Sequence, residues 1–266
     1  MSSRTLLLGL CFAVVSSSTF VCAQSTQTTP ELRTVDPPSP TATAEELETR
    51  GDSLRGTKFY ADAVDYYMAA IAKEDSATLR NKLGLANIDM MRFREAKKAF
   101  ERAIKINKKC AEAYNNLGAI YYIDAHNTRK AIRNYERAIK INDLQASFHS
   151  NLGTALFARK EYDRAAKEYQ RAMEIDPTIF EHHSRNGISA QLTPQDRGQF
   201  SLTVAKLYLH SGDVQHCLLY LKKAQEEGIK VAEKLEKDPA FLNYRKDPRF
   251  IAVIQHQPLG DLPDHP

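Results

Sequence analysis

The chain has 266 residues, of which 42% are apolar and 26% are charged, and it contains no Trp. Its 37 basic and 33 acidic residues leave a formal net charge of +4, which gives no reason to expect nucleic-acid binding. The composition excludes a chain that is disordered throughout and a polytopic membrane protein, and four Cys are too few for a fold built on disulfides.

Residues 1–23 have the features of a secretory signal peptide. Arg4 supplies a positive charge, an apolar stretch follows at 5–15, and residues 21–23 place small side chains before a cleavage point. The apolar stretch is far shorter than the roughly 20 residues of a membrane-spanning helix, so the alternative of an uncleaved anchor is less favoured. We predict an exported protein, periplasmic or secreted, with no transmembrane anchor after cleavage.

Residues 24–43 form a predicted linker. Twelve of these residues are Ser, Thr or Pro, a composition that cannot bury enough apolar surface to order the segment. A Pro-rich recognition motif is the alternative. Cleavage of the signal removes Cys11 and Cys22, and the sequence leaves open whether Cys110 and Cys217 are oxidised.

The rest of the chain repeats itself with a period of 33 to 35 residues. The repeated positions hold a glycine, then an alanine, then an aromatic residue, then a second alanine. They are Gly51, Gly84, Gly118 and Gly153; Ala63, Ala96, Ala131 and Ala165; Tyr67, Phe100, Tyr135 and Tyr169; Ala70, Ala103, Ala138 and Ala172. A period in this range predicts a solenoid, because each unit must stack on the next to bury its apolar face.

Each unit is predicted to be a pair of antiparallel helices. In the third unit one stripe of the first helix, with Gly118 and Tyr121, faces a stripe of the second helix, with Ala131 and Tyr135. Because Gly118 and Ala131 are small, the two helices can approach closely, and Tyr135 fills the space beside them.

This pattern resembles the tetratricopeptide repeat family. The third unit matches the family pattern best, with Tyr114, Leu117, Gly118, Tyr121, Ala131, Tyr135 and Ala138. The resemblance implies an all-α, right-handed superhelical solenoid of about five helix pairs, with C-terminal capping helices. The stretch from Phe180 through Phe250 also resembles the C-terminal part of exported bacterial members of the family.

The predicted organisation places four units at 44–76, 77–110, 111–145 and 146–177, so that they occupy 44–177. An insertion at 178–192 is expected to hold a short helical piece and an exposed loop. A degenerate fifth unit follows at 193–229, its first helix beginning at Pro194, and a cap and tail occupy 230–266. Asp238 and Asp247, each followed by Pro, are predicted to start short capping helices.

No catalytic motif is present, so we predict a protein that is not an enzyme and needs no cofactor or metal. The alternative is an enzyme-associated or metal-binding protein whose ligands come from His182, His183, His210, His216 and Cys217. The Lys and Arg residues of the second helices alternate with acids and are interpreted as solvated outer faces; they are Lys97, Lys98, Lys105, Arg133 and Lys140.

The candidate binding site is the inner face of the first helices. The sites that we predict for a protein or peptide ligand are Lys82, Asn115, Asn116, Tyr122, Asn151, Thr154 and Phe157, with Asn81, Leu85 and Ile88 on the same face. Asparagine both donates and accepts, which suits the backbone of an extended peptide, and Tyr122 and Phe157 would offer apolar platforms.

The basic clamp that holds a C-terminal carboxylate in some family members is not reproduced, since Ser147 and Asn151 stand where basic residues would be required. The predicted function is a non-catalytic scaffold or adaptor in the cell envelope that binds a protein or peptide of unknown identity, and no nucleic acid. A purely architectural spacer is the further alternative.

Overall fold

The structure, a computed structural model, describes residues 35–123, 127–180 and 194–255. These described residues contain helices and no strand, and from Pro37 onward they belong to one compact unit. The predicted signal peptide, the first part of the predicted linker and most of the predicted insertion, including His182 and His183, lie outside the described residues.

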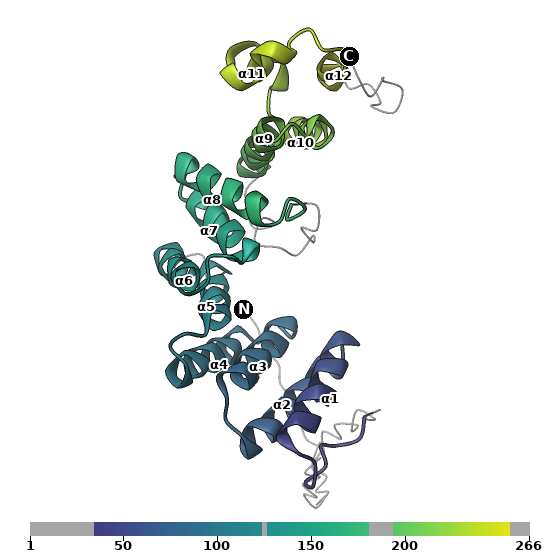
Figure 1. Ribbon diagram of the computed structural model, residues 1–266. Helices are drawn as coiled ribbons and strands as arrows, with labels where there is room; N and C mark the ends of the chain where they lie inside the picture. The colour runs from purple at the N-terminus through teal and green to yellow at the C-terminus, as the bar shows by residue number, and fades with distance from the viewer. Residues whose placement is uncertain (1–34, 124–126, 181–193, 256–266) are drawn as a thin grey trace, which may run out of the picture. The chain divides into compact units, whose positions relative to one another are not determined.

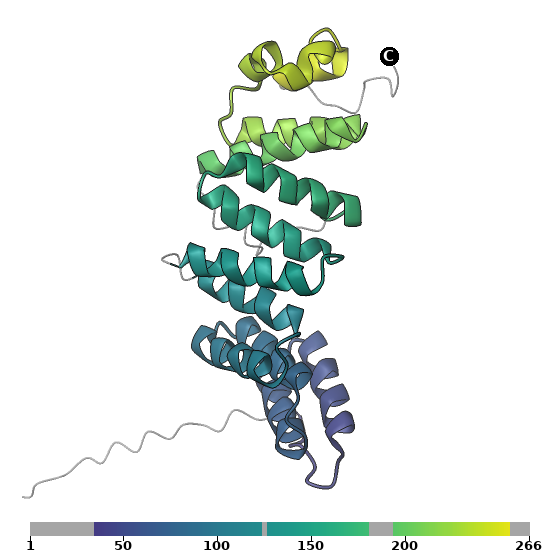
Figure 2. The ribbon, with the colours of Figure 1, turned by 60° about the vertical axis from the view of Figure 1, so that its left-hand side comes forward.

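Within the described residues, five antiparallel helix pairs follow one another along the chain (Figure 1). The pairs are α1 (Ala44–Gly56) with α2 (Tyr60–Lys73), α3 (Ala77–Asp89) with α4 (Phe93–Ile106), α5 (Ala111–Ile123) with α6 (Thr128–Ile141), α7 (Ala146–Ala158) with α8 (Tyr162–Ile175), and α9 (Pro194–His210) with α10 (Val214–Glu226). Each pair packs on the next, as the second view shows (Figure 2). The paired, stacked helices confirm the predicted all-α repeat fold.

The glycine of each first helix is required by the aromatic residue of its partner helix. A Cβ atom added to Gly118 would lie 2.7 Å from Cε1 of Tyr135, and one added to Gly84 would clash with Cε1 of Phe100. Both aromatic side chains are fully buried. The predicted close approach of the two helices is therefore confirmed, and the aromatic ring lies directly against the glycine.

The turn between the two helices of a pair needs a residue in the left-handed conformation. Lys58, Met91 and Lys160 occupy this place in three pairs, with φ of 68°, 57° and 64°, and Gly212 occupies it in the fifth with φ of 86°. Only glycine adopts this conformation without a steric cost, so three of these turns are held by the packing of the helices that they join.

The fifth pair departs from the regular units. Its first helix, α9, has 17 residues where α7 has 13, and Cys217 occupies the place of the first repeated alanine, fully buried. Phe180, at the start of the predicted insertion, is also buried, with its ring edge against Tyr169 and Phe200. This residue of the predicted insertion is therefore part of the core.

Short helices cover the last pair: α11 (Val231–Lys237), η2 (Pro239–Tyr244) and α12 (Pro248–Ile254). Asp238 and Asp247 accept hydrogen bonds from the backbone N–H groups of Ala240 and Arg249, which confirms the predicted helix starts. Phe241 and Phe250 are fully buried in the core cluster that includes α9 and α10.

The last residues of the predicted linker lie against the first pair. Thr43 and Glu46 form a capping box at the start of α1, and Nζ of Lys73 donates to the carbonyl oxygen of Pro40 at 2.6 Å. None of the described helices combines the length and the apolar character needed to cross a bilayer.

Candidate functional site

Four asparagines from three first helices form a continuous hydrogen-bonded row, which we call the asparagine row: Asn81, Asn115, Asn116 and Asn151. Nδ2 of Asn151 donates to Oδ1 of Asn115 at 3.0 Å, and Nδ2 of Asn115 donates to Oδ1 of Asn116 at 3.3 Å. Nδ2 of Asn116 in turn donates to Oδ1 of Asn81 at 3.0 Å. The row joins α3, α5 and α7 through their inner faces.

The two ends of the row keep hydrogen-bonding groups available. Within the described residues, Nδ2 of Asn81 donates to no partner and Oδ1 of Asn151 accepts from none. Asn81, Asn116 and Asn151 are partly exposed, whereas Asn115 is buried beneath them. The row therefore presents donors at the α3 end and an acceptor at the α7 end.

Lys82 lies beside the row but is already ion-paired. Its Nζ lies 2.5 Å from Oε1 of Glu48 and 2.6 Å from Oδ2 of Asp52, both on α1. Partial burial acts to lower the pKa of Lys82, but the hydrogen bonds to Asp52 and Glu48 outweigh it and raise that pKa. Arg55 is likewise paired, with Asp89 at 2.6 Å. A ligand carboxylate would have to compete with these carboxylates for either cation.

Three further predicted site residues are buried instead of lining an open surface. Phe157 is fully buried because Phe200 of α9 and Tyr162 of α8 meet its ring edge to face, with centroids 6.2 and 4.9 Å away. Tyr122 is 6% exposed, and burial, with a smaller contribution from Asp196, raises its pKa to about 12. The prediction that these two rings form platforms for a ligand is thus wrong.

Thr154 supports the core of its own pair. Its Oγ1 donates to the carbonyl oxygen of Ser150 at 2.9 Å and accepts from the hydroxyl of Tyr169 at 3.2 Å, and the side chain is 2% exposed. Thr154 is therefore not available to a ligand in this structure.

Apolar contacts near the row come from α3. Leu85 and Ile88 follow Asn81 by four and seven residues, which places them on the same side of that helix, and both are partly exposed. Asn81, Leu85 and Ile88 all belong to the predicted inner face, but none of the three is in the predicted set of site residues. The sequence indicates that Asn81 belongs to the site only through its separation of 35 residues from Asn116, its hydrogen-bond partner.

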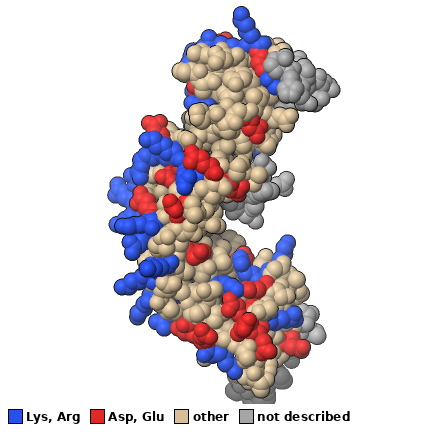
Figure 3. Space-filling model, viewed as in Figure 1, with Lys and Arg blue, Asp and Glu red and all other residues tan. Residues whose placement is uncertain are grey.

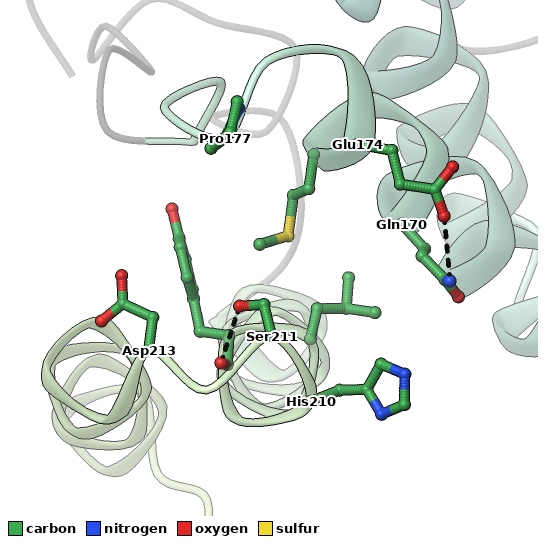
Figure 4. A pocket seen from close by; sticks show the side chains of 9 residues that line it. Gln170, Glu174, Pro177, His210, Ser211 and Asp213 are labelled. Carbon is green, nitrogen blue, oxygen red and sulfur yellow. Dashed lines mark hydrogen bonds between the residues drawn. The ribbon is translucent and has the colours of Figure 1, made fainter.

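A separate pocket of about 410 Å³ opens between α8 and α9 (Figure 4). Met173 and Leu207 contribute apolar surface, while Glu174, His210 and Ser211 are among its polar lining residues. Nε2 of Gln170 donates to Oε1 of Glu174 at 3.1 Å, and Oγ of Ser211 donates to the carbonyl oxygen of Tyr208 at 2.9 Å. Gln170, Glu174 and Ser211 are thus engaged with each other or with the backbone at the rim.

The described residues of the alternative metal site do not converge. Nδ1 of His216 lies 2.6 Å from Oδ2 of Asp213, and its ring stacks on Tyr208. Cys217 is buried, and burial raises the pKa of its thiol to about 12, which disfavours the thiolate that binds metals. Among the described residues no three His, Cys, Asp or Glu side chains are grouped as metal ligands. Cys110 and Cys217 are both free thiols.

The helix pairs of the central part match a known family. Residues 81–124 and 119–178 match the sequence profile described as Tetratricopeptide repeat. The match thus covers most of the segment from α3 to α8, and the profile describes a class of stacked helical repeat. No curated protein matches the chain in a sequence comparison.

Solved structures that align with this chain include MamA, YrrB and one peptide complex. MamA aligns with a TM-score of 0.47 and 22% identity over 69% of this chain and 96% of its own. YrrB, described as a TPR protein with an unusual peptide-binding site, aligns with a TM-score of 0.46 and 17% identity over 76% of this chain and 92% of its own. The first TPR domain of Spaghetti (RPAP3), bound to an HSP90 peptide, aligns with a TM-score of 0.42 and 19% identity over 44% of this chain and 94% of its own.

Proposed function

We propose that the protein is a non-catalytic scaffold or adaptor that holds an extended segment of a partner protein along the asparagine row. The observation that carries this proposal is the row itself, in which four amides from three consecutive repeats are bonded in series and leave free groups at both ends. An extended backbone offers alternating N–H and C=O groups, which match amide donors and acceptors.

The ligand that fits this surface is an internal segment and not a free C-terminus. Lys82 and Arg55 are both ion-paired with carboxylates of the protein, so a terminal carboxylate would meet no unpaired cation in them. Leu85 and Ile88 would contact apolar side chains of the ligand beside Asn81. The expected partner segment is therefore extended, uncharged at the row and apolar at one or two positions.

We also propose that the protein acts in the cell envelope after export. The support is the sequence of residues 1–23, with its positive start, short apolar stretch and small residues before the expected cleavage point. Cell fractionation with mass analysis of the purified protein checks this location. An N-terminus at Gln24 in the exported fraction is the expected result, and an uncleaved chain in the cytoplasm would contradict it.

The binding proposal predicts that N116A combined with N151A weakens capture of extended peptides. Peptides are first selected from a random library on the wild-type protein, and their affinities for the variant are then measured. N151A removes the acceptor at the α7 end and N116A breaks the row in its middle, which together should weaken binding by about tenfold or more. Circular dichroism and the urea midpoint check that the variant is folded.

A matched control is N107A combined with N142A. These asparagines are also 35 residues apart, but they lie at the ends of α4 and α6, where each accepts a local backbone hydrogen bond. The control should bind the selected peptides like the wild type. Equal binding by the wild type and by N116A/N151A would contradict the proposal, and so would a loss of equal size in the control.

A further inference from the structure

Two neighbouring second helices carry matching rows of cations, which we call the basic stripes. On α4 the stripe consists of Arg94, Lys98, Arg102 and Lys105, and on α6 of Arg129, Arg133, Arg137 and Lys140. Each stripe repeats the other at a distance of 35 residues. The spacing of four, four and three residues places each set on one side of its helix, and all eight side chains are exposed.

The basic stripes concentrate the charge of the whole chain. With their acidic residues included, α4 carries a formal charge of +3 and α6 of +4, whereas the complete chain carries only +4. The remaining residues therefore sum to −3. The corresponding places on α8 are Asp163, Lys167, Arg171 and Glu174, and those on α2 are Ala61, Asp65, Ala69 and Ala72, so the pattern stops at both neighbours.

Acids of the protein do not neutralise the stripes. Glu101 and Glu136 border them, but Glu101 pairs with Lys97 at 3.9 Å and Glu136 with Arg164 at 3.2 Å, both outside the stripes. Among the described residues, only Arg102 of the eight has a carboxylate partner, Asp75 at 2.9 Å. Of the five cations that the sequence interpretation places on solvated outer faces, only Lys97 has a carboxylate partner among the described residues.

The two stripes occupy equivalent places on the second helices of neighbouring pairs, and residues next to them approach one another. Lys97 of α4 and Lys130 of α6 approach the same ring, that of Tyr121, at 5.0 and 5.3 Å from its centroid. In Figure 3 many of the blue side chains project along the left-hand edge, where Figure 1 draws α6 and α8 and part of α4. Each stripe extends over about 16 Å of helix.

We propose that the basic stripes dock the protein on a bilayer that contains anionic phospholipids. Lipid headgroups form a broad anionic surface that long, mobile Lys and Arg side chains bind through charge alone, with each cation adding to the affinity. The asparagine row lies on the first helices, so docking through α4 and α6 leaves it open. This proposal does not depend on peptide binding by the row.

The composition of the surface favours lipid over other polyanions. Single-stranded nucleic acids need exposed aromatic rings for stacking, but Tyr114 and Tyr121 lie beneath Arg137, Lys97 and Lys130. A protein interface needs a buried apolar centre, and the stripes contain no large apolar side chain.

The test measures flotation of the full chain with vesicles of phosphatidylcholine that contain about one third phosphatidylglycerol. We expect binding at about 0.1 M salt, its loss at about 1 M, and none to vesicles of phosphatidylcholine alone. The variant R94Q/K98Q/R129Q/R133Q should lower the partition coefficient by about tenfold or more. All variants keep the same N-terminus, so any contribution of residues 1–23 is common to them.

The control K222Q/K230Q/K234Q/K237Q removes the same charge from exposed places on and around α10 and α11. It should retain binding within about twofold of the wild type if position matters more than net charge. Equal losses in both variants would overturn the proposal. Binding to polyglutamate or random-sequence DNA, without binding to the anionic vesicles, would also overturn it.

Discussion

The aromatic residue of the second helix occupies the same buried place in the first four pairs, and in the three pairs where it is Tyr its hydroxyl has a different environment. The hydroxyl of Tyr67 donates to Oδ1 of Asp52 at 2.7 Å, and that of Tyr169 donates to Thr154. The hydroxyl of Tyr135 is buried and has no hydrogen-bond partner among the described residues. Burial raises the pKa of Tyr135 well above its ordinary value, so this hydroxyl stays protonated.

We therefore expect opposite effects from removing two of these hydroxyls. Y135F should leave the free energy of unfolding unchanged or raise it by up to about 1 kcal/mol, because it removes a desolvated group that gains no bond. Y67F should lower it by about 1 kcal/mol, because it deletes a hydrogen bond to a carboxylate. Urea denaturation followed by circular dichroism measures both, and a clear loss of stability in Y135F would show that its hydroxyl has a partner.

At the scale of the element, the loop between α2 and α3 is tied to the second pair through Asp75. Its two oxygens accept from Nε of Arg80 on α3 at 2.7 Å and from the guanidinium of Arg102 on α4 at 2.9 Å. These hydrogen bonds, Arg80 first, lower the pKa of Asp75 to about 2. The carboxylate thus connects the first pair to both helices of the second.

D75N is predicted to destabilise the protein in a manner that depends on pH. Because the folded pKa lies below the unfolded value of about 3.9, the stabilisation is fully present above about pH 4 and is lost as pH falls toward 2. The group is partly exposed, so the effect at neutral pH should stay below about 1 kcal/mol. The urea midpoints of wild type and D75N, compared across pH, measure it.

E236Q serves as the control, because it removes the same negative charge as D75N but from an exposed side chain. Its difference from wild type should be smaller at neutral pH. A difference for D75N that grows as pH falls from 4 to 2 would contradict the assigned direction of the pKa shift.

At the scale of the whole molecule, the helix pairs contact their neighbours along the chain and little else. In such a stack stability is approximately a sum of the stabilities of the pairs and of the interfaces between neighbours. The C-terminal interface is formed by Phe241 and Phe250, which are fully buried, and Nε2 of Gln225 on α10 donates to the carbonyl oxygen of Ile254. A defect in this region should therefore remain local.

F250A tests this locality. Removing a fully buried ring typically costs about 3–5 kcal/mol, which should unfold the cap formed by α11, η2 and α12. Hydrogen exchange should accelerate there and in α10, while the amides of α1 to α4 keep their wild-type protection. L242A, at a side chain that is 46% exposed, should change neither region. Uniform acceleration along the chain would mean that the protein unfolds as one cooperative unit.

The repeated pairs could be predicted because their determinants recur within each unit. A glycine such as Gly118 and an aromatic residue such as Tyr135 lie 17 residues apart in one hairpin, so their contact is implied by the period. The basic stripes also follow the repeat period, since Arg94 and Arg129 occupy equivalent positions. Only the structure shows that the stripes are not neutralised by Glu101 and Glu136, because these acids pair with Lys97 and Arg164.

The accessible part of the inner face was decided by the tertiary structure. Phe157 occupies an inner position by its repeat number, but Phe200 from the longer α9 covers it, and an irregular helix is invisible to a periodic argument. Likewise the asparagine row joins Asn116 to Asn81 diagonally, and not to Lys82, its repeat equivalent. Local period determines which residues face inward, whereas contacts across units determine which of them a ligand can reach.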